Sequence, residues 1–239
     1  MKEAYIRFMA PVNPQTTDSL IKLIDDRIRN GYQKIHLLIS SPGGSVFHGL
    51  SLYNFLYGIP LEVDTYNFGS VDSIGVILFC AGKNRYSVPN ARFLIHGVNF
   101  QVGGPTGFDE KMLEEHLKSL QIDQQNIAKV IAFTTGKKED DIKNDMHNRT
   151  TLSPEEAKKY GLVTEIKDKL MPANAEFYSI GEMDNHQMQF APQMPHPFFL
   201  QQLIPQAQGV PVNQNLTVPL IKGYTSMYDR GFAFTNNYR

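Results

Sequence analysis

Apolar and polar residues alternate in clear patterns along the first two thirds of the chain. Helices are expected where apolar residues recur every three or four positions, at 17–29, 46–57, 107–133 and 154–160, with a short apolar helix after Gly75. Strands are expected where short apolar runs are bounded by turn residues, at 4–10, 34–40, 61–68, 85–88, 91–97 and 162–166. This alternation predicts an α/β domain with a largely parallel sheet.

The composition changes near Met171, where charged residues become rare and Gln, Pro and Asn become frequent, while Phe and Tyr persist. We therefore predict a folded domain at residues 1–170 and a low-complexity tail at 171–239. The stretch 189–206 is apolar enough to dock onto its own domain or a neighbouring subunit, so docking and disorder both stay open. Deletion after Leu170 is expected to leave a folded domain with altered assembly size or solubility.

Composition excludes several classes of protein. The formal net charge of -1 gives no indication of binding to nucleic acid or to an anionic membrane. The single cysteine, Cys80, lies in an apolar run and is expected in the core, and one cysteine excludes a disulfide scaffold. No apolar run approaches the roughly 18 residues of a membrane span, and the N-terminus does not resemble a signal peptide. A soluble, cytoplasmic protein is expected.

Three places carry candidate chemistry. Gly43 and Gly44 follow a strand, Ser73 lies on a strand-to-helix turn, and His96 ends an apolar strand. Acyl transfer needs a nucleophile, a base and hydrogen-bond donors for the developing oxyanion, and these places supply such groups. Each signal is weak alone, because a Gly-Gly pair is usually a turn and a lone histidine is usually structural. No metal-ligand spacing, phosphate loop or dinucleotide fingerprint occurs, so no cofactor is predicted.

The order of four blocks changes this weighing: ISSPGG, GSVDSIGVILFCAG, RYSVPNARFLIH and LSPEEAKKYGLV. Together they resemble the proteolytic subunit of the Clp protease, the ClpP family, over residues 4–166. The resemblance implies a crotonase-like fold, which is a spiral of ββα units with a protruding helical handle. It also implies that Ser73 is the nucleophile and His96 the general base, with the backbone N–H groups of Gly44 and Ile74 as the oxyanion hole.

The resemblance further implies a serine endopeptidase that hydrolyses peptides or unfolded proteins inside an oligomeric chamber. Its subunits would form a homo-oligomeric ring, the helix at 107–133 would make contacts between rings, and an ATPase unfoldase would be a candidate partner. The chain begins close to its first strand. We therefore expect the family's N-terminal axial segment to be missing, which leaves docking of an ATPase open.

The sequence departs from the family near the site. Arg149 stands where the family has the third member of the triad, an aspartate, and arginine cannot hold the imidazole tautomer or stabilise the imidazolium. Asn148 and Asp145 lie nearby and are the candidates for this role after a shift of the loop. Asp72 replaces a small apolar residue before the serine and is expected to turn outward into solvent. His96 is followed by Gly-Val instead of Gln-Pro.

Two other functions stay open. Arg149 favours a catalytically weak or inactive ring or scaffold subunit with the same fold. A crotonase-type acyl-CoA enzyme also uses two backbone N–H groups as an oxyanion hole, so Gly44 alone does not exclude it. That third function leaves the pair of Ser73 and His96 without a role.

Overall fold

The computed structural model describes residues 1–99 and 107–181. The stretch 189–206, for which docking and disorder stayed open, lies outside the described residues. The strands are β1 (Glu3–Met9), β2 (Lys34–Ser41), β3 (Glu62–Asp72), β4 (Arg85–Ser87), β5 (Arg92–Ile95), β6 (Thr150–Leu152), β7 (Glu165–Ile166) and β8 (Phe177–Gly181). The helices are α1 (Pro14–Arg29), α2 (Val46–Gly58), α3 (Gly75–Cys80), α4 (Glu110–Thr135), α5 (Glu139–His147) and α6 (Pro154–Tyr160).

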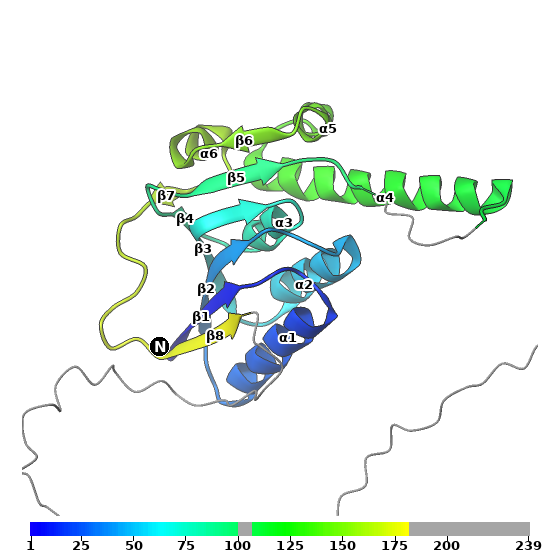
Figure 1. The fold of residues 1–239 in the computed structure, drawn as a ribbon. Coiled ribbons are helices and arrows are strands. Elements are labelled where there is room, and N and C mark those ends of the chain that lie inside the picture. The colour runs from blue at the N-terminus through cyan, green and yellow to red at the C-terminus, as the bar shows by residue number, and fades with distance from the viewer. Residues whose placement is uncertain (100–106, 182–239) are drawn as a thin grey trace, which may run out of the picture. The chain divides into compact units, whose positions relative to one another are not determined.

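The strands form one sheet in the order β6-β5-β3-β2-β1-β8, and β4 pairs with both β3 and β7 (Figure 1). All these pairs are parallel except β5 with β6. The predicted α/β domain with a largely parallel sheet is therefore confirmed. Parallel neighbours need a crossover connection, and α1, α2 and α3 supply the crossovers between the first strands.

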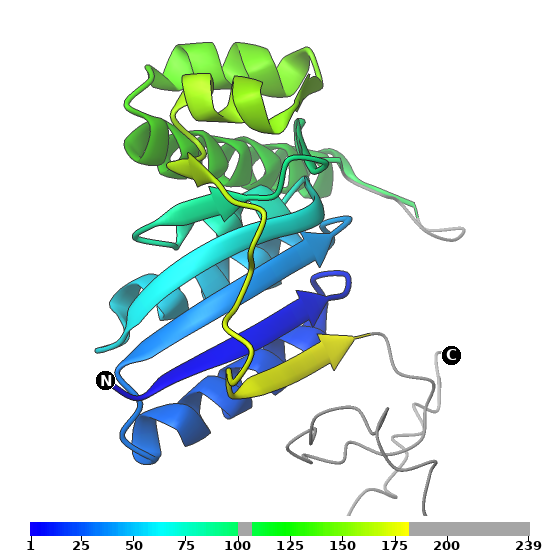
Figure 2. The same cartoon turned by 90° about the vertical axis from the view of Figure 1, so that its left-hand side faces the viewer.

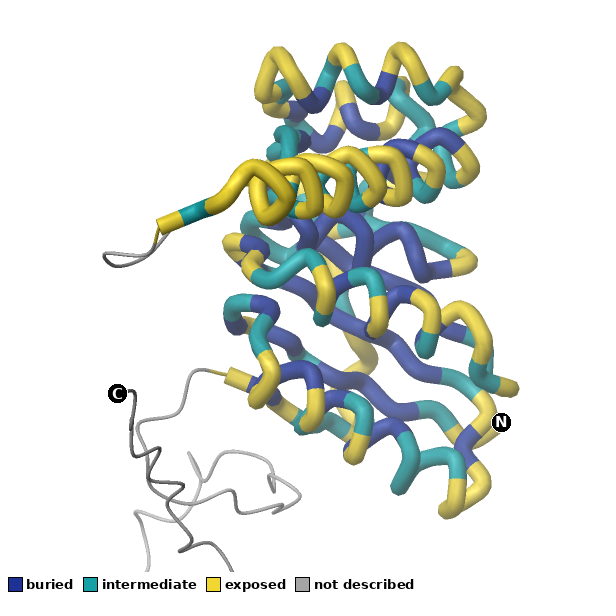
Figure 3. The backbone as a smooth tube through the Cα atoms, turned by 90° about the vertical axis from the view of Figure 1, so that its right-hand side faces the viewer, coloured by how far each residue is buried: buried dark blue, intermediate teal, exposed yellow. Residues whose placement is uncertain are grey.

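The main core lies between the sheet and the helices α1 to α4, which cover one of its faces (Figure 1). Fully buried side chains from both layers fill it, among them Phe8, Phe79 and Phe93. The central strands are buried, whereas the far part of α4 stands exposed (Figure 3). Within the described residues, no helix is both long and apolar enough to cross a membrane.

Two helix starts show how local sequence sets the boundaries. Asn13 caps α1 through a capping box with Thr16, and Pro14 fits the first turn, so this helix begins earlier than the predicted 17. Ser153 forms the expected capping box at α6, and Gly161 ends that helix in the left-handed conformation. The sequence did not predict α5 or β6. Both are short, and β6 is held by its pairing with β5.

The C-terminal strand β8 lies beyond the predicted end of the domain. It pairs with β1 at the edge of the sheet, and the segment that leads to it crosses the open face of the sheet (Figure 2). Arg27 of α1 forms an ion pair with Glu176 at 3.3 Å and lies 4.2 Å from the centre of the Tyr178 ring. The sheet therefore continues past Leu170, where the sequence predicted that the folded domain ends.

Two truncations test whether β8 belongs to the folded domain. Deletion after Leu170 is expected to lower the free energy of unfolding by about 3 kcal/mol, because Phe177 and Ile180 lose their burial against the sheet. Deletion after Gly181 retains β8 and is the reference against which this loss is measured. Urea unfolding followed by circular dichroism measures both. Equal stability of the two truncations would show that β8 contributes nothing.

Candidate active site

Ser73 lies on a strained turn between β3 and α3. Its φ of 58° is in the left-handed region, which non-glycine residues rarely adopt and which is found at functional sites. Its N–H donates a hydrogen bond to the carbonyl of Leu94 at 2.8 Å, and its own carbonyl accepts from Val76 at 3.0 Å. The turn therefore fixes the backbone of Ser73 between β5 and the first turn of α3.

The glycine pair after β2 allows the backbone to approach this turn closely. Gly43 has a φ of +89°, and a Cβ there would lie 2.5 Å from the Cβ of Ser73. Gly44 has a φ of +147°, and a Cβ there would lie 2.2 Å from the carbonyl oxygen of Val12. Both positions need glycine for conformation and for space. The main chain of residues 43–44 thereby forms one wall beside Ser73.

Among the described residues, some backbone N–H groups that line the site have no hydrogen-bond partner. Gly44 and Ile74, the residue that precedes α3, each have such a group. Both residues line the same cavity as Ser73. Backbone donors held in place beside a reacting carbonyl are suited to stabilise an oxyanion.

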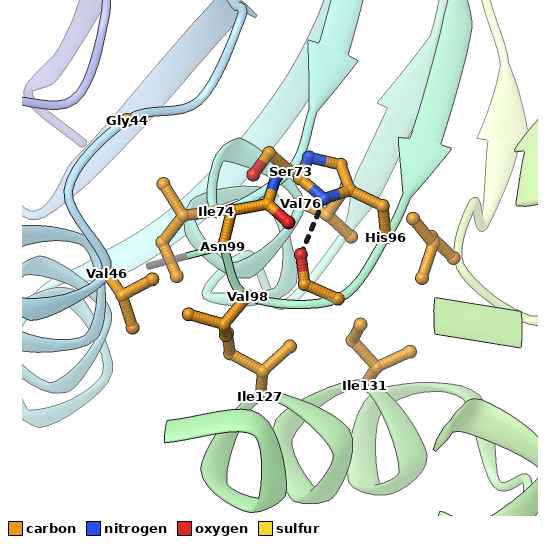
Figure 4. A pocket seen from close by; sticks show the side chains of 12 residues that line it. Gly44, Val46, Ser73, Ile74, Val76, His96, Val98, Asn99, Ile127 and Ile131 are labelled. Atoms are coloured by element: carbon orange, nitrogen blue, oxygen red, sulfur yellow. Dashed lines mark hydrogen bonds between the residues drawn. The ribbon is translucent and has the colours of Figure 1, made fainter. Parts of the chain in front are cut away.

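The imidazole of His96 is oriented by the backbone carbonyl of the next residue, Gly97. Nδ1 lies 2.7 Å from the carbonyl oxygen of Gly97, and because a carbonyl only accepts, Nδ1 carries the proton. In the neutral ring Nε2 is then unprotonated, and Figure 4 shows this nitrogen on the side of Ser73. No hydrogen bond joins Ser73 to His96 in the part of the chain described; such bonds often tighten only when substrate binds.

The cavity beside these groups has a volume of about 390 Å³. Ser73 and His96 lie at one side of it, while α4 contributes apolar side chains opposite (Figure 4). The apolar lining consists of Val46, Ile74, Val76, Ile95, Val98, Ile127 and Ile131. The volume falls in the range of ligand-binding pockets in proteins.

Within the described residues, no hydrogen bond joins Asp145 or Asn148 to the imidazole of His96. The carboxylate of Asp145 accepts a hydrogen bond of 2.6 Å from the hydroxyl of Tyr160, and burial together with this bond raises the pKa of Tyr160. Asn148 is exposed at the end of α5, and Arg149 is exposed on a left-handed turn. Instead, the acceptor on Nδ1 is the Gly97 carbonyl, which no sequence motif indicated.

The expectation for Asp72 was wrong. The residue is only 8% exposed, and its Oδ2 accepts a hydrogen bond of 2.8 Å from Arg92, whose side chain is half exposed. The reason lies in the register: β3 and β5 pair Ser70 with Arg92 and Asp72 with Leu94. Alternation along the strands puts Asp72 and Arg92 on one face of the sheet, where their charges meet.

The single cysteine does not line the cavity. Cys80 is buried in the core as predicted, and burial raises the pKa of its thiol to about 11, which disfavours the nucleophilic thiolate. In the described ranges, no group of three or more His, Cys, Asp or Glu could hold a metal ion.

Comparison with known proteins identifies the family. The model of the Clp protease family matches residues 1–169. The chain belongs to the Clp protease family. It is 31% identical over 169 residues to the ATP-dependent Clp protease proteolytic subunit of Bdellovibrio bacteriovorus. This alignment covers 70% of this chain and 79% of that protein.

A solved structure shows the same fold. The chain is similar to a ClpP1 point mutant from Listeria monocytogenes with a TM-score of 0.62 and 27% sequence identity, over 69% of this chain and 91% of that one. The expected ClpP-like fold is thereby confirmed. The long helix α4 stands where the resemblance placed the handle, at 110–135 instead of 107–133.

The close contact between Gly43 and Ser73 can be tested with two glycine substitutions. Gly43→Ala is expected to lower covalent labelling of Ser73 by a fluorophosphonate about tenfold or more, because the new methyl group displaces the serine. Gly31→Ala is the matched control, since Gly31 also has a positive φ of +73° but nothing within 4 Å. Gly31→Ala is expected to lose stability only. Equal labelling of both variants would contradict this account.

Proposed function

We propose that this chain is a ClpP-type serine endopeptidase in which Ser73 is the nucleophile and His96 the general base. The observation that carries the proposal is the bond from Nδ1 of His96 to the Gly97 carbonyl at 2.7 Å. It selects the tautomer whose Nε2 can accept a proton from a serine hydroxyl. The unpartnered N–H groups of Gly44 and Ile74 in the same cavity support it.

The proposed reaction proceeds through an acyl-enzyme. Oγ of Ser73 attacks the peptide carbonyl carbon while Nε2 of His96 takes the hydroxyl proton. The carbonyl oxygen becomes an oxyanion that accepts hydrogen bonds from Gly44 and Ile74. The C–N bond then breaks, and the leaving amine takes the proton from Nε2. Water hydrolyses the ester with His96 acting again as base, which frees Ser73.

The Gly97 carbonyl is proposed to orient the ring but only partly to replace an aspartate. A carbonyl dipole fixes the tautomer, yet it carries no full charge to stabilise the imidazolium. Replacing the aspartate of a serine-protease triad by asparagine lowers kcat about 10⁴-fold. We therefore expect slow turnover unless Asn148 or Asp145 reaches the ring after a loop shift.

The substrate class follows from the cavity and from the family. The apolar part of the cavity would hold an apolar side chain next to the scissile bond of a peptide or unfolded protein. The exposed apolar residues of α4 support assembly of copies into a ring-shaped chamber: Met112, Leu113, Leu117 and Ile122. An ATPase unfoldase is a candidate partner, because a relative's name describes the proteolytic subunit of an ATP-dependent protease. No cofactor is required for the cleavage.

The second candidate is an inactive ring or scaffold subunit. It is favoured by Arg149 at the position of the triad aspartate and by the bond that occupies Asp145 with Tyr160. A crotonase-type acyl-CoA enzyme is less consistent, since it would leave Ser73 and His96 unused. Calorimetry with a coenzyme A thioester separates it, because only that function requires binding.

Fluorophosphonate labelling of the purified chain at neutral pH tests the main proposal. Wild-type protein is expected to be labelled, and both Ser73→Ala and His96→Ala are expected to abolish labelling, since one removes the nucleophile and the other the base. Intact-mass spectrometry measures the adduct. A folded, oligomeric wild type that takes no label would favour the scaffold function.

The role of the third residue can be tested separately. Asn148→Ala and Asp145→Asn are each expected to keep labelling within about threefold of wild type, because neither side chain contacts His96. Tyr160→Phe is the matched control, since it frees the carboxylate of Asp145 without changing its charge. A loss of tenfold or more in Asn148→Ala or Asp145→Asn alone would identify that residue as the orienting group.

A further inference from the structure

The strands that carry Ser73 and His96 are joined by a short ladder. Ser73 follows the last residue of β3, and His96 follows the last residue of β5. Only three residue pairs connect these strands, and the N–H of Ser73 extends the ladder by its bond to Leu94. A slip of one residue would move the two side chains apart by about 3.3 Å. The alignment of nucleophile and base therefore depends on this register.

One ion pair spans that ladder. Nη2 of Arg92, at the first position of β5, lies 2.8 Å from Oδ2 of Asp72, at the last position of β3. The carboxylate is buried, and its Oδ1 has no hydrogen-bond partner in the described chain. Arg92 is also held through its carbonyl, which accepts from Asn67 of β3 at 2.8 Å. Arg92 thus supplies the charge that offsets the buried carboxylate.

We propose that the ion pair of Arg92 with Asp72 positions the serine strand against the histidine strand and neutralises a buried negative charge next to the nucleophile. Arg92 and Asp72 are thus positioning residues of the site. The inference rests on the proposed function. It adds to it a pair of side chains that touches neither the substrate nor the reacting atoms.

The charge of Asp72 matters because the site is otherwise almost free of charge. Among the described residues that line the cavity, His96 is the only one with an ionisable ring, and α4 contributes Ile127 and Ile131. On α5 the carboxylate of Asp145 is bonded to Tyr160 of α6, and the exposed Arg149 precedes β6. Removal of Arg92 would leave a bare carboxylate that disfavours the oxyanion and favours the imidazolium of His96.

The two effects of the pair can be separated by a double-mutant cycle of Arg92→Ala, Asp72→Ala and both together. All three variants lose the ion pair across the ladder, but only Arg92→Ala leaves a buried charge. The first readout is the pH midpoint for modification of His96 by diethyl pyrocarbonate, resolved by mass spectrometry. The second is the rate of labelling of Ser73 by a fluorophosphonate.

Arg92→Ala is expected to raise the pH midpoint of His96 by about half a unit or more, because the bare carboxylate stabilises the imidazolium. The double variant is expected to return to the wild-type midpoint. Labelling is expected to fall about thirtyfold in Arg92→Ala and about threefold in the other two variants. If the pair had a structural role alone, the variants would lose stability, but the pH midpoint of His96 would not shift selectively in Arg92→Ala.

Controls keep the outcomes distinct. Lys22→Ala breaks the exposed ion pair with Asp18 on α1 and is expected to change neither readout. Arg92→Gln also removes the charge but loses less packing, and it is expected to show the same shift of the His96 midpoint. It replaces Arg92→Ala in the experiment if that variant does not fold. A midpoint equal to wild type in a folded Arg92→Gln overturns the proposal. Absent labelling of the wild type overturns only the proposed function, because the midpoint of His96 is measured without Ser73.

Discussion

The parallel pairing of β3 with β5 is the contact on which the site depends. The carboxyl ends of parallel strands meet at one edge of a sheet, so the residues that follow these strands, Ser73 and His96, come together there. The bond between the N–H of Ser73 and the carbonyl of Leu94 belongs to both the ladder and the site. A backbone bond that holds the serine in a left-handed turn also holds it at a fixed place relative to β5. A change that weakens the pairing of β3 with β5 is therefore expected also to change the geometry of the site.

Most of the polar groups at this edge come from the main chain. Gly44 and Ile74 present N–H groups, and Gly97 presents the carbonyl that orients the imidazole. Gly97 is itself held, since its N–H donates to the carbonyl of Met146 at 3.0 Å. Backbone dipoles fixed in this way need little reorganisation when charge develops. They are also weaker than a full charge.

In the part of the chain that the structure describes, α1 to α4 cover one face of the sheet and leave the other face open, although parallel sheets are usually covered on both faces. On the open face a second apolar cluster forms around Tyr5, Leu38 and Tyr66, and Leu170 from the segment before β8 and Phe177 of β8 pack against it. His36 is buried next to this cluster and bonds to Tyr66 and Glu3, each at 3.0 Å. The C-terminal segment therefore adds to the burial of this face, and the sheet continues past the change in composition.

The sequence by itself determined the alternation of strands and helices, the breakers that end them and the residue types of the site. Apolar periodicity and turn residues act over a few neighbours, so the strands around Ser73 and His96 and the long helix α4 were predictable. Only the tertiary structure decided the surroundings of Asp72, the acceptor for His96 and the place of β8. Asp72 meets Arg92 twenty residues away, and β8 pairs with β1 from the other end of the domain. Such contacts depend on which strands become neighbours, and no local pattern of side chains records that choice.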